Sequence, residues 1–429
     1  MAKGISPARL TAFKILQQVE GGGYSSVLLA AEEPRLQAVD RSLCHELVLG
    51  VLRWQLLLDK FVEHFSKRRI ESLDPPVRIA LRLGLYQLRF LTRIPASAAV
   101  NESVNLVRMA RLSSAAPFVN AVLRRAAREP EYDPAAEVSD PLEKIAIETS
   151  HPVWLIERWA KSFGFDEARA FAYANNLVPP TTFRVVANRA EESDVLSRLS
   201  AAGATLESST VAKGAWRVTG ATAVLRELSA EGRVYLQDDA SQLVAHVVDV
   251  KPGERVLDLC AAPGGKTTLM ADRAGALVVA ADRSAARLDT IVATMHLHEL
   301  NNIEPVLLDA AEELPFWNGS FDRVLVDAPC SGTGTLRRNP EIRWRLSPAD
   351  IPALAEQQKR ILGMAMKMVK PDGRLVYSTC SVEREENEEV VAEYSPLETI
   401  RTWPHRDGCD GFFIATTAGH GGPPLQSSK

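Results

Sequence analysis

Residues 257–270 read LDLCAAPGGKTTLM, an apolar run followed by a Pro-Gly-Gly turn and the start of a helical pattern. Gly264 and Gly265 permit a tight turn and a close approach of a ligand to the backbone. The letters GKT match the end of a phosphate-binding loop, but that signature needs a glycine five positions before its final glycine, where this chain has Cys260. The stretch therefore indicates a strand, a ligand-binding turn and a helix, and an NTPase is the weaker alternative.

Further apolar runs follow this stretch, with helical patterns between them. Strands buried on both faces of a parallel sheet have this continuous apolar character, because helices cover both faces. The alternation predicts a doubly wound α/β domain over residues 238–420. The expected strands are RVLDLC (255–260), LVVAAD (277–282), PVLLD (305–309), FDRVLVDAP (321–329) and GRLVYSTC (373–380).

The N-terminal part of the chain has a different character. Residues 1–130 hold 19 Lys and Arg against 11 Asp and Glu, although the whole chain has a net charge of −4. Apolar residues recur there at three- and four-residue spacing, for example over residues 41–65, which predicts an all-α bundle over residues 1–135. Basic clusters at 66–70 (SKRRI) and 123–128 (LRRAAR) could meet a phosphate backbone, or they could be ordinary solvated helix faces.

An acidic, proline-containing connector over about 130–145 leads to a third segment. In residues 145–237, helical patterns alternate with short strand patterns, which predicts a small α+β domain with an antiparallel sheet. The expected strands are TTFRVVAN (181–188), ATLESS (204–209), AWRVTG (215–220) and RVYLQDD (233–239).

Several classes of protein are disfavoured. No apolar run is long enough to span a bilayer, and the N-terminus lacks the apolar core of a secretory signal, so a cytoplasmic location is expected. The cysteines are widely spaced, which argues against structural zinc and a disulfide framework. We expect a monomer that requires no metal. The cysteines are Cys44, Cys260, Cys330, Cys380 and Cys409.

Polar residues stand at the ends of the predicted strands of the α/β domain, where such sheets bind ligands. Asp282 could accept hydrogen bonds from both ribose hydroxyls of an adenosine, and Asp309 could accept from the adenine amine. The Gly-x-Gly-x-x-Gly pattern of a dinucleotide site is absent. S-adenosylmethionine carries a positive sulfonium and therefore suits a carboxylate-rich pocket better than NAD or ATP.

Three motifs carry a family resemblance: DLCAAPGGKT (258–267), VDAPCSGTGTLRRNPEIRW (326–344) and YSTCSVEREENEEVV (377–391). In order and spacing they resemble the RNA cytosine-C5 methyltransferases, and the basic N-terminal segment resembles the NusB-like RNA-binding domain of the bacterial 16S ribosomal RNA branch. The resemblance implies a NusB-like bundle, a small α+β domain and a Rossmann-like class I methyltransferase domain that uses S-adenosylmethionine. The implied partner is small-subunit ribosomal RNA, and the family's target is cytosine 967.

The reaction explains why cysteines and an aspartate occur in these motifs. Carbon 5 of cytosine is a poor nucleophile, so a thiolate must first add to carbon 6. Cys380 precedes an expected helix that Ser381 would cap, and the positive end of that helix would favour a thiolate. Asp327 could stabilise the charge that develops at N3 of the base. We interpret the following glutamates, Glu383, Glu385 and Glu386, as compensation of the helix dipole.

Spacing alone does not distinguish the two motif thiols. The resemblance implies that Cys380 is the covalent nucleophile and that Cys330 assists release of the product. It also places Lys266 near the methionine moiety and the target base. The residues implied to bind the cofactor are Cys260, Ala261, Ala262, Pro263, Gly264, Gly265, Lys266, Asp282, Asp309 and Asp327.

The segment LRRNPEIRWR (336–345) combines cations with an aromatic ring. Arg337, Arg338, Arg343 and Trp344 could contact an RNA backbone and stack on a base, or they could support the active-site loop. A non-catalytic RNA-binding factor and a transfer-RNA methyltransferase remain alternatives.

Overall fold

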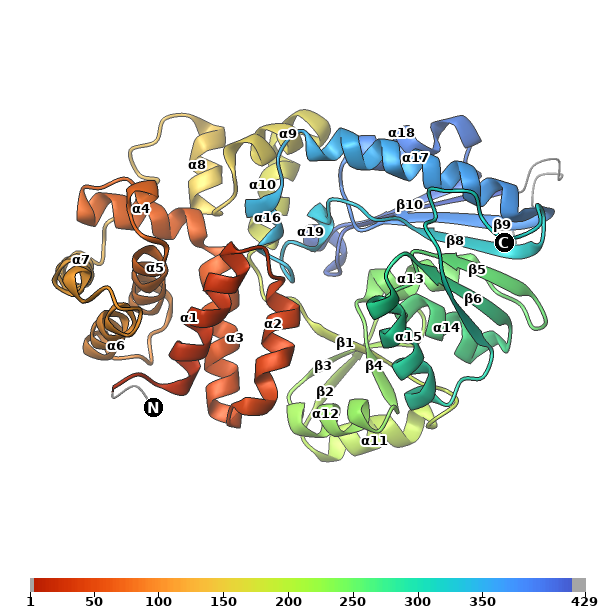
Figure 1. Ribbon diagram of the computed structural model, residues 1–429, viewed down its shortest axis with the longest axis horizontal. Helices are drawn as coiled ribbons and strands as arrows, with labels where there is room; N and C mark the ends of the chain where they lie inside the picture. The colour runs from red at the N-terminus through yellow and green to blue at the C-terminus, as the bar shows by residue number, and fades with distance from the viewer. Residues whose placement is uncertain (1–3, 419–429) are drawn as a thin grey trace. The chain divides into compact units, whose positions relative to one another are not determined.

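The computed structural model describes residues 4–418, which form two compact units (Figure 1). The helical unit runs to Leu177 and also includes Leu336–Arg345. The sheet unit comprises the other described residues, Val178–Thr335 and those after Arg345. The three domain boundaries expected from the sequence stay a prediction.

The helical unit contains the all-α bundle that the apolar spacing predicts. Proline occupies the first turn of α1, α5, α7 and α8, where its missing N–H costs no hydrogen bond. The apolar core draws on α1 to α7. The helices are α1 (Pro7–Glu20), α2 (Ser25–Glu32), α3 (Ala38–Arg53), α4 (Gln55–Ser66), α5 (Pro75–Phe90), α6 (Ala96–Met109), α7 (Ala116–Arg128), α8 (Pro141–Glu148), α9 (Val153–Phe163), α10 (Phe165–Ala174) and α16 (Ile342–Arg345).

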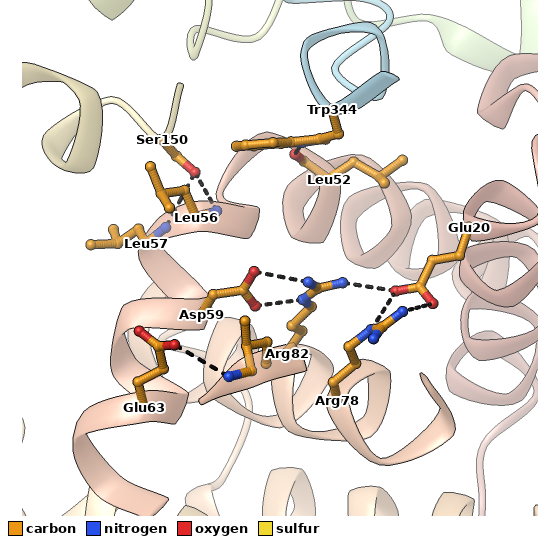
Figure 2. Close-up of polar contacts among 11 residues, drawn as sticks. Glu20, Leu52, Leu56, Leu57, Asp59, Glu63, Arg78, Arg82, Ser150 and Trp344 are labelled. Atoms are coloured by element: carbon orange, nitrogen blue, oxygen red, sulfur yellow. Dashed lines mark hydrogen bonds and ion pairs between the residues drawn. The ribbon is translucent and has the colours of Figure 1, made fainter. Parts of the chain in front are cut away.

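A buried ion network joins three of these helices, as Figure 2 shows. Arg82 of α5 donates to both carboxylate oxygens of Asp59 on α4, at 2.7 and 2.8 Å. Its remaining nitrogen donates to Glu20 of α1 at 2.9 Å, and Glu20 also pairs with Arg78. A guanidinium that is bonded at both edges satisfies its buried charge and fixes the register of the three helices.

The sheet unit begins with a β-α-β-β-α-β module. Its four strands have the order β2-β3-β1-β4, and every neighbouring pair is antiparallel. Helices α11 and α12 contribute to its apolar core. The elements are β1 (Thr181–Val185), α11 (Glu192–Ala201), β2 (Thr205–Ser208), β3 (Ala215–Thr219), α12 (Thr222–Ala230) and β4 (Val234–Leu236), which confirms the predicted antiparallel sheet.

A seven-stranded sheet forms the rest of this unit, in the order β10-β11-β9-β8-β5-β6-β7. The five predicted apolar strands are present and parallel, and β10 and β11 add an antiparallel edge. The strands are β5 (Arg255–Leu259), β6 (Leu277–Asp282), β7 (Ile303–Leu307), β8 (Phe321–Asp327), β9 (Val369–Thr379), β10 (Glu398–Thr402) and β11 (Phe412–Ala418).

Helices cover both faces of this sheet, which explains its continuous apolar strands (Figure 1). Helices α17 (Asp350–Met368) and α18 (Glu388–Val391) pack on one face. Helices α13 (Asp239–Val248), α14 (Gly265–Ala274) and α15 (Ala285–His298) pack on the other. The chain moves outward from β5 through β6 to β7 and then returns to β8 on the other side of β5, so the strand order switches between β5 and β8. Ligands of doubly wound sheets bind at such a switch.

Among the described residues, none of the helices combines the length and the apolar character that crossing a membrane requires.

Candidate active site

The two motif cysteines lie together at the carboxyl ends of neighbouring strands. Cys330 follows β8 and Cys380 follows β9, and these parallel strands pair Asp327 with Ser378. This register places the two sulfur atoms 3.4 Å apart, and both cysteines remain free thiols with partly exposed side chains. The two motif thiols are therefore in contact, and their separate roles stay a prediction.

A buried carboxylate holds the two cysteine-bearing loops together. Glu386 accepts hydrogen bonds from the backbone N–H and the hydroxyl of Ser331, at 2.8 and 2.5 Å, and from the Ser381 hydroxyl at 2.5 Å. Gln358 of α17 also donates to it, at 3.0 Å. The interpretation of Glu386 as a helix-dipole glutamate is wrong, because this fully buried side chain links the residues that directly follow Cys330 and Cys380.

The expectation of a helix directly after Cys380 is also wrong. The chain forms only a 3-10 turn over Arg384–Glu386, whose N-cap is Glu383, before the short α18. Ser381 does not cap a helix; its hydroxyl accepts from the Glu383 N–H at 3.1 Å and donates to Glu386. A helix dipole therefore does not account for a thiolate at Cys380.

An ion pair stands beside the cysteines. Lys266 Nζ, at the start of α14, lies 2.7 Å from Asp327 Oδ2, and the Ser378 hydroxyl donates to Asp327 Oδ1 at 2.8 Å. Burial alone would lower the pKa of Lys266, but the Asp327 carboxylate outweighs burial and raises that pKa above its ordinary value; negative charge on Cys380 contributes in the same direction. Lys266 is therefore an ammonium. A thiolate at Cys380 would favour this charged form further.

The environment distinguishes Cys330 from its neighbour. The hydrogen bond with Cys380, followed by burial, raises the pKa of Cys330 well above its ordinary value. Cys330 therefore keeps its proton at neutral pH and is the donor of the pair when Cys380 carries charge.

One cavity is lined by the two carboxylates for which the sequence predicts contacts to an adenosine, and those contacts stay a prediction. It measures about 50 Å³ and is lined by Cys260, Asp282, Asp309 and the apolar Leu308 and Ile361, among others. Asp282 is the last residue of β6, and Asp309 follows the end of β7 by two residues. Burial raises the pKa of Cys260 to about 12, so its thiol is not ionised there.

A second cavity of about 180 Å³ adjoins the ion pair. It is lined by Asp258, Ala261, Ala262, Pro263, Gly265, Lys266 and Asp327, and by Tyr235, Leu236, Gln237 and Ser241. Asp258 Oδ2 accepts from Thr267 at 2.6 Å, whereas its buried Oδ1 has no hydrogen-bond partner among the described residues. Burial raises the pKa of Asp258 to about 7. Motif residues thus line this second cavity together with Tyr235 and Gln237, which no sequence motif marked.

The cavities fit a methyl donor with an adenosine and an amino-acid end. Gly264 has φ +101°, a conformation that favours glycine. A Cβ at Gly265 would lie 3.0 Å from the Tyr235 ring. The glycine turn, the strand-end carboxylates and the unpartnered Asp258 oxygen thus offer a cradle and negative charge to a cationic nucleoside.

The sequence leaves RNA contact and support of the active-site loop both open for Arg343 and Trp344; burial rules out RNA contact for Arg343, whereas the half-buried Trp344 uses its indole N–H within the helical unit. Arg343 is fully buried and donates to Ser150 O and Asn176 Oδ1 at 3.1 Å, with other carbonyl oxygens at 3.4 to 3.5 Å. Trp344 donates to Leu52 O at 2.6 Å (Figure 2).

Arg337 is also buried, and its carbonyl oxygen accepts from Arg53 at 3.0 Å. The basic clusters are placed differently, since Lys67, Arg68 and Arg69, and also Arg124 and Arg128, are exposed on the helical unit.

Comparison with known proteins agrees with this arrangement. Residues 6–128 match the NusB family, 151–225 match the ferredoxin-like domain of RsmF/B-like methyltransferases, and 245–418 match the 16S rRNA methyltransferase RsmB/F family. The chain is 34% identical to the probable ribosomal RNA small subunit methyltransferase B of Bacillus subtilis (strain 168), over 94% of this chain and 96% of that protein. It belongs to the 16S rRNA methyltransferase RsmB/F family.

A second relative of the family, ribosomal RNA small subunit methyltransferase B of Pseudomonas putida (strain KT2440), is 37% identical over 90% of this chain and 88% of its own. The solved structure of PH0851 has a TM-score of 0.83 at 27% identity and covers 96% of this chain and 98% of its own. The structure of NSun6 from Pyrococcus horikoshii with SFG has a TM-score of 0.56 at 20% identity, covers 62% and 98% of the two chains, and shows a shared fold alone. The family confirms the NusB-like, ferredoxin-like and Rossmann-like folds.

Proposed function

We propose that this protein transfers a methyl group from S-adenosylmethionine to carbon 5 of a cytosine in small-subunit ribosomal RNA. Family membership supports an RNA methyltransferase, and the names of the relatives support ribosomal RNA as the substrate. The observation that carries the proposal is the Cys330–Cys380 pair, 3.4 Å apart beside the Lys266–Asp327 ion pair. S-adenosylmethionine would supply an electrophilic methyl group, with its adenosine between Asp282 and Asp309.

In the proposed first step, the thiolate of Cys380 bonds to carbon 6 of the cytosine. The electron pair of the 5,6 double bond becomes available at carbon 5, and charge also develops toward N3. The Lys266 ammonium donates to Asp327 at 2.7 Å, and a proton that this pair relays to N3 would stabilise that charge. The base must leave any stacked helix to reach these groups.

Carbon 5 would then accept the methyl group. The electron pair of the broken sulfur–methyl bond would stay on the sulfur of S-adenosylmethionine. Release requires loss of the carbon-5 proton and cleavage of the carbon 6–sulfur bond, whose electron pair returns to Cys380. The hydrogen bond with Cys380 is the largest cause of the raised pKa of Cys330. A thioether sulfur accepts a hydrogen bond poorly, so this cause is lost while Cys380 is bonded to carbon 6. The pKa of Cys330 thus falls once Cys380 is bound to the ring, so Cys330 loses its proton to solvent more readily and its thiolate can take the carbon-5 proton, which supports its role in release.

Bisulfite sequencing of 16S ribosomal RNA from cells with and without the gene tests the proposal. The expected result is one cytosine, at position 967, that resists conversion only when the protein is present. Complete conversion at every site in both strains would contradict it. Resistance at a transfer-RNA cytosine instead would reassign the substrate.

A further inference from the structure

The β-α-β-β-α-β module is fixed to the methyltransferase sheet by buried polar contacts within one unit. Arg184 of β1 is fully buried and donates to Thr268 of α14 at 2.8 Å. Asp272 of α14 accepts from the backbone N–H groups of Ala187 and Asn188, each at 2.9 Å. These contacts hold the end of β1 against α14, and β4 pairs with β1 in the same sheet.

This arrangement places Tyr235 and Gln237 against the glycine turn. A Cβ at Gly265 would lie 3.0 Å from the Tyr235 ring and 3.2 Å from Gln237 Nε2. The Arg184 guanidinium stacks 5.0 Å from the centre of the Tyr235 ring and lies 3.4 Å from Gln237 Oε1, so both side chains are held in place. The small module therefore forms one wall of the 180 Å³ cavity.

The polar groups that face this cavity are incompletely satisfied. The buried Asp258 Oδ1 makes no hydrogen bond to any residue within 4–418, while Gln237 Nε2 donates to Ser241 at 3.0 Å and the half-buried Tyr235 lines the cavity beside them. Burial raises the pKa of Tyr235 above its ordinary value, so its phenol remains a hydrogen-bond donor. Buried polar atoms without partners are costly, and a polar ligand would satisfy them.

The charged groups that line the cavity indicate which class of ligand it binds. Asp258 and Asp327 place two carboxylates around the single ammonium of Lys266, so the cavity has excess negative charge when Asp258 is ionised. An amino-acid group offers an α-ammonium to Asp258 and an α-carboxylate to the phenol and amide donors. S-adenosylmethionine carries such a group and one net positive charge, whereas a cytosine base is neutral and would leave the Asp258 oxygen without a cation.

We infer that Tyr235 and Gln237 of the small α+β module bind the α-amino-acid end of the methyl donor, with Asp258 receiving its α-ammonium. This inference rests on the proposed function, because it concerns the cofactor of that reaction. It makes the module part of the cofactor site rather than a separate RNA-binding attachment.

The test is equilibrium binding of two neutral thioethers to the full-length protein. S-adenosylhomocysteine contains the amino-acid end, and 5′-methylthioadenosine lacks it. Tyr235→Phe and Gln237→Met should each weaken S-adenosylhomocysteine about tenfold, the order of one lost hydrogen bond to a charged group, and leave methylthioadenosine unchanged. Asp309→Asn, at the adenosine end, should weaken both ligands. Tyr173→Phe, which removes an exposed hydroxyl from the helical unit, should weaken neither.

Unchanged affinity of both variants for S-adenosylhomocysteine would overturn the inference. So would an equal loss for both ligands, because that pattern means the residues only support the turn. A rise in KM for RNA with unchanged S-adenosylhomocysteine affinity would overturn it and assign the cavity to the target base. If the wild-type protein bound neither thioether, the proposed function would fail and this inference with it.

Discussion

The sulfur atoms of Cys330 and Cys380 lie 3.4 Å apart, although 50 residues separate them in the chain. The parallel pairing of β8 and β9 brings the two strand ends together, and Glu386 links the residues that follow each cysteine. The strand pairing therefore brings the two thiols together, and the buried Glu386 carboxylate links the loops that carry them.

Glu386→Gln tests that link. Glutamine keeps the size but replaces one acceptor oxygen by a donor, so the hydroxyls of Ser331 and Ser381 lose a shared acceptor. We expect methyl transfer to slow about 10- to 100-fold, while S-adenosylhomocysteine affinity changes less than about twofold. The measurement is single-turnover transfer of a labelled methyl group. Glu389→Gln, at an exposed position close by, should behave as wild type; equal rates for all three proteins would count against the link.

Asp327→Asn tests the ion pair. The pair raises the pKa of Lys266 above its unfolded value, so its stabilising contribution is present at neutral pH and is lost only as pH rises through the raised pKa. Without the carboxylate, burial dominates and the pKa of Lys266 should fall below its ordinary value. Lys266 should then react faster with acetic anhydride near about pH 8, as measured by mass spectrometry. The exposed Lys359 serves as internal reference; a slower or unchanged reaction of Lys266 would refute this prediction.

Asp258 should make cofactor binding pH-dependent. Its pKa of about 7 means that, without ligand, this carboxyl holds a proton below that pH, and the α-ammonium of a bound ligand favours the ionised form. The groups around it are Thr267, Lys266, Asp327 and Asp282. S-adenosylhomocysteine should therefore bind more tightly as pH rises from about 6 to about 8, by calorimetric titration. Asp258→Asn should abolish this dependence; a slope that persists in the variant would exclude Asp258 as its origin.

Arg343→Met should destabilise the helical unit. The guanidinium donates hydrogen bonds to carbonyl oxygens at the C-terminal ends of several helices, including Asn175 O after α10 and Thr149 O after α8. Without it these buried oxygens lose a partner, which costs about 2 kcal/mol of unfolding free energy. Hydrogen exchange of the ends of α3, α8 and α10 measures this loss. Arg360→Met, at an exposed position of α17, should change stability by less than about 0.5 kcal/mol; similar protection in both variants would argue against the anchor.

Local patterns predicted the strands of the sheet and the position of each cysteine after a strand, because both depend on short-range signals. Continuous apolar runs mark strands that are covered on both faces, and Asp327 and Thr379 end such runs just before their cysteines. The pairing of β8 with β9, which the structure shows, then brings Cys330 and Cys380 together.

The sequence did not predict the features that depend on tertiary packing. Glu386 lies in the acidic string EREENEE, which is typical of an exposed turn, yet the chain folds it inward to meet Ser331. Arg343 stands among basic residues that suit RNA, but helix ends from distant parts of the chain enclose it. Tyr235 lies in an ordinary strand pattern, and only the docking of the small module places it at the cavity.

The most direct test of the central claim is covalent trapping with Cys330→Ala. If Cys380 attacks the base and Cys330 assists release, this variant, incubated with S-adenosylmethionine and small-subunit ribosomal RNA, should accumulate a protein–RNA adduct that survives denaturing electrophoresis. The double variant Cys330→Ala/Cys380→Ala should form none. An adduct that persists without Cys380, or methylation that continues with Cys380→Ser, would contradict the account.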